Sequence, residues 1–151
     1  MNSLFAKALV AFLALPGIVA FLVPLLLKPD TRVFSAWWGL VPLGVGSVLL
    51  LACVREFHVA GHGTLAPWAP PTRLVATGLY RWSRNPMYVA VLLILTGWAI
   101  GYQSWPMALY AVAVAVVFHL RVVLHEEPWL ARTFGDVWTQ YQAKVPRWLW
   151  G

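Results

Sequence analysis

Four apolar segments constrain the fold of this chain more than any other feature of its sequence. They cover residues 4–27, 36–54, 87–101 and 106–124. An α-helix rises ~1.5 Å per residue, so about 20 apolar residues cross a hydrocarbon core of ~30 Å. Charged residues make up only 11% of the chain, against roughly 25% in a typical soluble domain. The sequence therefore predicts an all-α integral membrane protein with four transmembrane helices in one domain, residues 1–151.

The first apolar segment has a second interpretation, a cleaved signal peptide. It is longer than the apolar region of most signal peptides, and no small-x-small cleavage pattern follows it. These two observations favour a membrane helix. Pro16-Gly17 and Pro24 are expected to kink that helix, which a membrane tolerates.

The connections between the segments differ in length and character. Residues 55–86 hold four prolines and three glycines, so a long loop is expected there. The break at 102–106 has room only for a tight turn, so the third and fourth helices should form an antiparallel hairpin. In the tail, 125–151, apolar residues recur at helical spacing and predict an amphipathic interfacial helix over 128–143. Residues 145–150 resemble an interfacial aromatic and basic anchor.

The basic residues predict the orientation of the chain in the membrane. Nine of the eleven lysines and arginines share one side if both termini, the 55–86 loop and the tail lie there. These nine are Lys7, Arg55, Arg73, Arg81, Arg84, Arg121, Arg132, Lys144 and Arg147. The positive-inside rule then places both termini of this multi-pass chain in the cytosol. Because basic residues flank apolar segments and form no separate patch, the net charge of +6 does not indicate nucleic-acid binding.

The expected hairpin brings two polar clusters to one level. If its turn is centred on Gln103–Ser104, residues 84–88 and 119–127 lie at about equal distances from the turn. Polar clusters that converge at the mouth of a helix pair are where a site is expected in a helical membrane protein. The sequence thus predicts a candidate site near the cytosolic end of the hairpin.

Several polar residues at this end have two interpretations. Arg121, inside the fourth apolar segment, either extends to the lipid headgroups or contacts an anion, which is a substrate or Glu126. Glu126 and Glu127 are either a solvated helix end or the acids of a site. His58 and His62 have the spacing of a metal pair, but glycines weaken the helix there and no third ligand is evident, so no metal site is expected.

Two stretches of the sequence resemble a known family. Residues 74–88, LVATGLYRWSRNPMY, resemble the signature of the isoprenylcysteine carboxyl methyltransferase family, and the related phospholipid N-methyltransferases share its Arg-His-Pro-x-Tyr core. Glu126-Glu127, with Phe134-Gly135, Tyr141 and Val145-Pro146, resembles the second signature of that family. The 37 residues between Tyr88 and Glu126 match the helical hairpin that the family has there. The similarity spans roughly residues 63–148.

The resemblance implies an integral membrane methyltransferase that binds S-adenosylmethionine without a Rossmann domain. The methyl acceptor would be a lipophilic molecule or membrane lipid, either an isoprenylcysteine-like carboxylate or a lipid amine. Glu126 would lie near the reacting centre, and Arg121 matches an arginine that contacts substrate. By position, the cofactor would be bordered by Thr72, Arg73, Leu74, Val75, Tyr80, Asn85, Pro86, Met87, Tyr88, Glu126 and Glu127. Asn85 stands where the motif has His, and it can donate a hydrogen bond but cannot take up a proton.

Two alternatives to a methyltransferase remain open on the sequence. One is an NADPH-dependent membrane reductase of the steroid-reductase type, whose carboxyl-terminal architecture is similar. The other is a non-catalytic membrane scaffold. Binding of S-adenosylhomocysteine, of NADPH or of neither separates the three.

Overall fold

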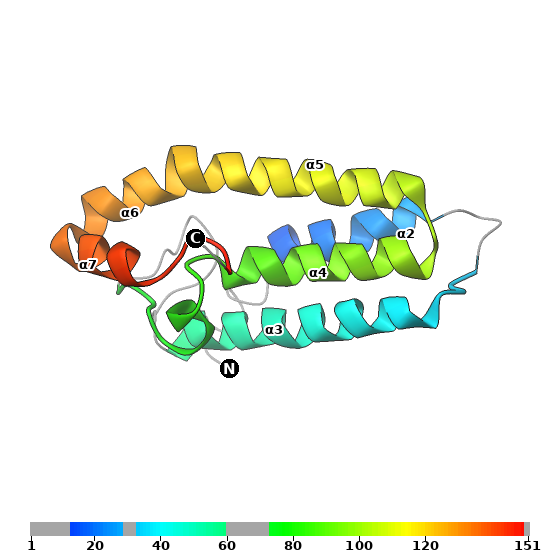
Figure 1. The fold of residues 1–151 in the computed structure, drawn as a ribbon, viewed down its shortest axis with the longest axis horizontal. Helices are drawn as coiled ribbons and strands as arrows, with labels where there is room; N and C mark the ends of the chain where they lie inside the picture. The colour runs from blue at the N-terminus through cyan, green and yellow to red at the C-terminus, as the bar shows by residue number, and fades with distance from the viewer. Residues whose placement is uncertain (1–12, 29–32, 60–72, 150–151) are drawn as a thin grey trace.

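The computed structural model describes residues 13–28, 33–59 and 73–149, and within these ranges all regular structure is helical, as expected (Figure 1). The α- and π-helical elements are η1 (Leu13–Leu22), α2 (Val23–Leu27), α3 (Leu40–Val59), α4 (Pro86–Gly101), α5 (Trp105–Arg121), η4 (Val122–Glu126), α6 (Glu127–Phe134) and α7 (Asp136–Lys144). Two short 3₁₀ turns, η2 (Trp37–Gly39) and η3 (Gly78–Arg81), precede α3 and α4.

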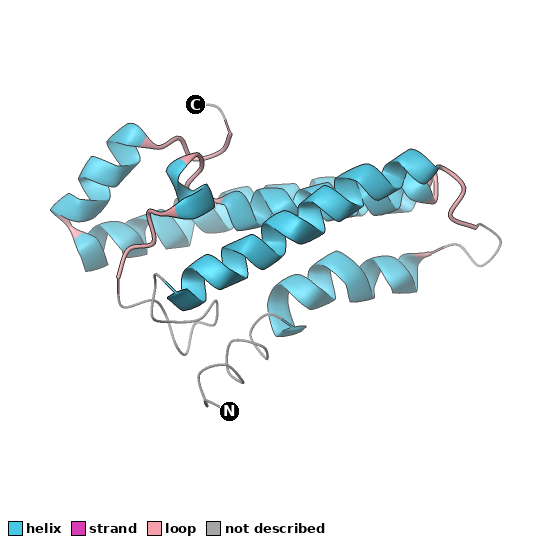
Figure 2. Cartoon of the chain, turned by 90° about the horizontal axis from the view of Figure 1, so that it is seen from below, coloured by secondary structure: helices cyan, strands magenta, loops and turns pink. Residues whose placement is uncertain are grey.

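The long helices lie side by side and alternate in direction. In Figure 1, α3, α4 and α5 run parallel to the long axis, and η1 with α2 lies behind α4. The turn between α4 and α5 occupies Tyr102–Ser104, with Gln103 at φ 48°, which confirms the predicted hairpin. Figure 2 shows η3, α6, α7 and the carboxyl-terminal segment together at the other end of the bundle. Segments far apart in sequence therefore meet at that end.

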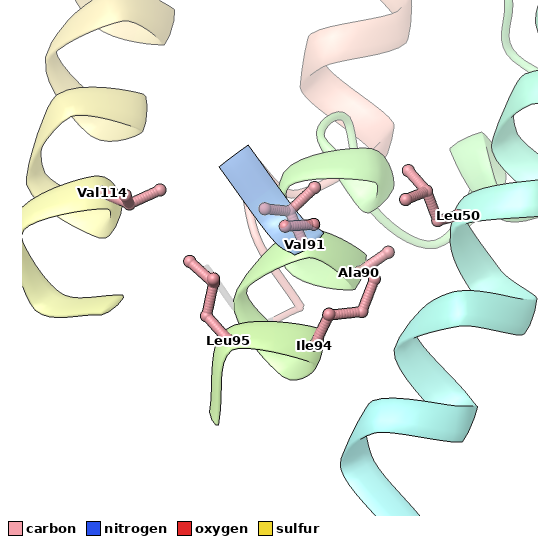
Figure 3. Packing of buried hydrophobic residues seen from close by; sticks show 7 residues of the cluster. Leu50, Ala90, Val91, Ile94, Leu95 and Val114 are labelled. Atoms are coloured by element: carbon pink, nitrogen blue, oxygen red, sulfur yellow. The ribbon is translucent and has the colours of Figure 1, made fainter. Parts of the chain in front are cut away.

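Helix α4 is the centre of the bundle, because its neighbours cover it on several sides. Its buried side chains include Ala90, Val91, Ile94 and Leu95. Figure 3 shows Leu50 of α3 on one side of this cluster and Val114 of α5 on the other. A helix covered in this way is fixed in rotation, and that fixes where the side chains of its first turn point.

Glycines let α3 approach α4 closely. A Cβ atom added to Gly46 would lie 2.6 Å from the backbone oxygen of Ala90, and one added to Gly39 would lie 2.6 Å from the nitrogen of Gly101. Gly97 faces Gly39 and the backbone of Leu43 in the same way. Small residues of this kind are typical of helix contacts inside membranes, where close backbone approach supplies the packing energy.

The outer surface of the bundle is apolar, as a lipid environment requires. Among the described residues, two helices are long and apolar enough to cross a membrane, Trp37–Glu56 and Trp105–Phe134. Two further apolar helices, Pro16–Leu27 and Pro86–Gly101, are shorter. Large apolar side chains are exposed along the outer faces of α3 and α5, among them Val41, Val45, Val48, Leu51, Leu109, Val112, Val116, Val117 and Leu120. A surface of this extent indicates a membrane protein.

Three predicted boundaries were wrong. α3 continues to Val59, so the loop does not begin at residue 55. The fourth helix does not end at residue 124 but continues through η4 and α6 to Phe134. The wider π turn of η4 lies just before Pro128 and accommodates the proline, which has no N–H to donate. The amphipathic helix predicted over 128–143 is instead two helices, because Gly135 adopts φ 50°, a conformation that favours glycine.

Candidate functional site

The first turn of α4 and the end of α5 meet as the hairpin register predicted. Asn85 precedes α4, and Pro86 occupies its first turn, where its missing N–H costs nothing. Two residues later, in the same turn, the hydroxyl of Tyr88 donates a hydrogen bond to Oε1 of Glu126. The Tyr88 ring packs on Phe118 of α5, with 4.3 Å between the ring centroids.

Arg121 completes this cluster from the same helix as Glu126. Its Nε donates a hydrogen bond to Oε1 of Glu126 over 2.7 Å. Contact with Glu126 was one of the interpretations that the sequence left open for Arg121, and it is the one that the structure shows. The two residues are five apart, and the intervening π turn, in which residues five apart pair, brings them to one face. The side chain of Arg121 is 52% exposed and that of Glu126 is 30% exposed. Among the described residues no donor bonds the other oxygen of Glu126, Oε2.

Glu127 points to a different set of partners. Arg84 donates from Nη1 to its Oε1 over 2.9 Å. Arg147 forms a two-pronged pair with it, from Nε to Oε1 and from Nη2 to Oε2, both 2.8 Å. Forked pairs of this kind are strong and directional. The adjacent glutamates are therefore held by different arginines, Glu126 by Arg121 and Glu127 by Arg84 and Arg147.

The carboxyl-terminal segment, residues 145–149, lies against the loop before α4. The backbone N–H of Arg84 donates to the carbonyl of Pro146 over 2.9 Å. The side chains of Asn85 and Ser83 both donate to the carbonyl of Arg147, over 3.0 Å and 3.3 Å. Asn85 thus acts as a donor to this segment. The sequence analysis did not identify Arg84 and Arg147 as partners of Glu127. The presence of two acids at an apolar helix end could have indicated them, because such acids require nearby cations.

Arg84 has an unusual environment for a cation. Burial lowers the pKa of its guanidinium, although Glu127 opposes that effect. The guanidinium lies 5.6 Å from the centre of the Trp138 ring. Its Nε is buried and has no hydrogen-bond partner among the described residues. Two guanidinium groups, of Arg84 and Arg147, face one carboxylate, so this end of the cluster carries an excess positive charge.

The remaining predicted residues occupy different environments. Val75 and Tyr80 pack with Cys53 of α3 in a separate buried cluster, and Met87 lies between that cluster and the main core. Leu74 packs on the cluster of Trp138, Tyr141 and Val145. Arg73 is exposed, and Thr72 lies outside the described residues. Tyr88, Arg121 and Glu126 are brought into direct contact; Val75, Tyr80 and Arg73 are not part of that contact.

Among the described residues, no histidine forms a hydrogen bond or ion pair with this cluster. His119 faces Trp148 with 6.2 Å between ring centres, and His125 is exposed. The His58 side chain and His62 lie outside the described part of the chain. Within that part, no three His, Cys, Asp or Glu side chains gather as metal ligands do.

A shallow apolar groove of about 440 Å³ lies near the hairpin turn, lined by residues that include Ile100, Ser104 and Ala108.

Comparisons with known proteins point to one family. A family model described as phospholipid methyltransferase matches residues 34–137, which include α3, α4, α5 and the paired glutamates. A protein of Haemophilus influenzae, described as an uncharacterized protein, is 33% identical over 63 residues, which are 42% of this chain and the whole of that relative. No solved structure matches the chain.

Proposed function

The chain belongs to the phospholipid methyltransferase family, and on that premise we propose that it transfers a methyl group from S-adenosylmethionine to a lipophilic acceptor at the cytosolic face of a membrane. In this proposal the 151 residues form one domain with four membrane-spanning helices and both termini in the cytosol. The lengths of the two long apolar helices, and the packing of the two shorter ones beside them, support this topology.

The observation that carries the proposal is the contact of Tyr88 with Glu126. It joins two stretches of sequence that are 38 residues apart and that the family signatures contain. Arg121 bonds the same carboxylate. A hydroxyl, a guanidinium and a carboxylate thus converge at the end of an otherwise apolar helix pair. Polar groups cost free energy in such a place, so a cluster of them indicates a functional site.

The residues present suit the proposed methyl donor in two respects. A sulfonium cation is attracted by a carboxylate and by aromatic faces, and the carboxylate of Glu126 accepts a hydrogen bond from Tyr88, whose ring packs on that of Phe118. The donor also carries a carboxylate, and the buried Nε of Arg84 is a hydrogen-bond donor that no described residue satisfies. We propose that the donor is bordered by Thr72, Arg73, Leu74, Val75, Tyr80, Asn85, Pro86, Met87, Tyr88, Glu126 and Glu127.

The proposed chemistry asks little of the protein beyond alignment. When bound, S-adenosylmethionine supplies an electrophilic methyl group on a positively charged sulfur. Arg121 orients an acceptor carboxylate, which is already ionised at neutral pH. An acceptor amine must first lose a proton, and Oε2 of Glu126 accepts it. Both cases depend on correct positioning and on exclusion of water more than on a covalent intermediate.

The surroundings of Arg121 support a lipophilic acceptor. Val117 and Leu124 are exposed apolar residues on α5 and its continuation, four positions before and three positions after Arg121. Residues three or four apart lie on the same helix face. An acceptor with its polar end at Arg121 can therefore lay its apolar part along this face, within the lipid.

The direct test is to incubate the purified chain in lipid nanodiscs with labelled S-adenosylmethionine and total membrane lipid. The proposal expects label in a lipid-soluble product, whose mass identifies the acceptor as a carboxylate or an amine. Calorimetry with S-adenosylhomocysteine and with NADPH separates the alternatives. Binding of NADPH alone would indicate a reductase, and binding of neither would indicate a scaffold.

A further inference from the structure

The side chain of Arg147 links the carboxyl-terminal segment to the start of α6. Its forked pair with Glu127 crosses from the last described residues of the chain to the junction of η4 and α6. Side-chain exposure is 12% for Arg84, 17% for Glu127 and 35% for Arg147, so water competes little for the carboxylate. The backbone of the same segment is held by Arg84, Ser83 and Asn85 of the loop before α4. Arg147 thus joins that loop to the acidic pair.

We infer that Arg147 is a positioning residue for the donor site, acting through Glu127, and this inference rests on the function proposed above. Both oxygens of Glu127 are occupied by guanidinium groups, whereas Glu126 retains an oxygen with no donor among the described residues. The two adjacent acids therefore have different roles. Glu126 meets the reacting groups, and Glu127, at the border of the donor, holds the carboxyl-terminal segment against the loop of residues 83–85.

The consequence of losing Arg147 follows from this geometry. Without the fork, Glu127 keeps only Arg84, and its carboxylate is free to rotate. Glu126 directly precedes Glu127, so its carboxylate is held less firmly in position. The carboxyl-terminal segment also loses its link to α6. Donor binding should weaken because the residues that border the donor are no longer held in one arrangement. The chemical step should change less, since Tyr88 and Arg121 still hold Glu126.

The experiment compares full-length variants in nanodiscs by KM and kcat for S-adenosylmethionine, with the thermal midpoint measured in parallel. Arg147→Ala should raise KM about tenfold, the effect of losing one charge-assisted pair, with kcat within about twofold. Arg147→Lys should restore part of the loss, because lysine supplies the charge but not the fork. Lys144→Ala is the matched control, since Lys144 is an exposed cation three residues earlier, and it should behave as wild type.

A double-mutant comparison tests the route through Glu127. Glu127→Gln keeps the shape of the side chain and removes its charge, and adding Arg147→Ala to it should change KM by no more than about twofold. Fully multiplicative effects on KM would overturn the route through Glu127.

An arginine with a merely structural role would lower the thermal midpoint and the active fraction and leave KM unchanged. That result in Arg147→Ala overturns the inference but not the proposed function. A wild-type chain that methylates nothing and binds no S-adenosylhomocysteine overturns the proposed function itself. If Arg147→Ala does not fold, a wild-type KM in both Glu127→Gln and Arg147→Lys would overturn the inference.

Discussion

Trp98 donates a hydrogen bond from its indole Nε1 to the backbone carbonyl oxygen of Ala20, over 3.0 Å. Pro24, four residues after Ala20, has no N–H with which to bond that carbonyl in an α-helix. Tyr110 makes a similar bond, from its hydroxyl to the carbonyl of Val19 over 3.2 Å. An unsatisfied carbonyl inside a membrane costs several kcal/mol, so two side chains of the hairpin compensate for an irregular helix. These bonds connect η1 to α4 and α5.

Replacing Trp98 by Phe should therefore destabilise the bundle. The variant keeps an aromatic ring but leaves the carbonyl of Ala20 without its indole donor, which should cost about 1–2 kcal/mol. Thermal unfolding in detergent measures the loss. Trp105→Phe is the control, because Trp105 is 74% exposed, and its midpoint should stay that of wild type. Equal midpoints for Trp98→Phe and wild type would show that this bond contributes nothing.

The hydroxyl of Tyr88 should matter more for turnover than for folding. Tyr88→Phe keeps the ring on Phe118 and removes the bond to Glu126, so methyl transfer should fall roughly 10- to 100-fold. The thermal midpoint should stay close to that of wild type, because the packing is retained. Initial rates with labelled donor provide the measurement, and Tyr102→Phe at the opposite end of α4 serves as control. Wild-type rates from Tyr88→Phe, and full transfer by Tyr88→Ala, would remove Tyr88 from the site.

Glu126→Gln separates the two kinds of acceptor. The amide cannot take up a proton, so turnover with an amine acceptor should fall about 100-fold or more. A carboxylate acceptor needs no proton removed, and its turnover should fall much less. Rates measured with both acceptor types in the same nanodiscs give the comparison. Equal and small effects on both would indicate that Glu126 does not accept a proton.

Two neighbouring glycines of α3 should respond very differently to the same change. A Cβ atom at Gly46 would overlap the backbone of Ala90, so Gly46→Ala forces α3 away from α4. Gly44→Ala meets nothing within 4 Å and is the matched control. The first variant should lose about 1–3 kcal/mol of stability, and the second should be neutral or slightly stabilised, because alanine favours helix. Unfolding midpoints in one detergent test both, and equal midpoints would contradict the close contact of α3 with α4.

Tyr141 should make stability fall at alkaline pH. Its hydroxyl donates to the carbonyl of Tyr80 over 2.7 Å, and burial raises its pKa from 10 to about 12. Between about pH 10 and pH 12 the unfolded chain has lost this proton while the folded chain retains it, so stability decreases as pH rises through that window. Tyr141→Phe should be less stable at pH 8 and lose less over the same window. Unfolding midpoints from pH 8 to pH 12 measure both slopes, and identical slopes would contradict the assignment.

The sequence alone was sufficient for the all-helical class of the fold and for the level at which the polar residues meet. Long apolar segments have few alternatives to helices, because a membrane leaves no backbone hydrogen bond unsatisfied. A tight turn at residues 102–104 then sets residues 84–88 level with residues 119–127, since both helices rise equally. The contacts of Tyr88 and Arg84 with the paired glutamates confirm that inference about position. The functional roles of these residues stay predictions.

Tertiary structure alone decided which glutamate pairs with which arginine. In an uninterrupted α-helix, residues 121 and 126 would point in different directions, and only the π turn of η4 brings them to one face. That turn arises where the helix continues through Pro128, which its sequence pattern did not predict. The pairing of Arg147 with Glu127 depends on the path of the chain after Gly135, a residue whose positive φ breaks the amphipathic pattern. Periodicity describes one helix at a time, whereas these contacts depend on how separate segments pack.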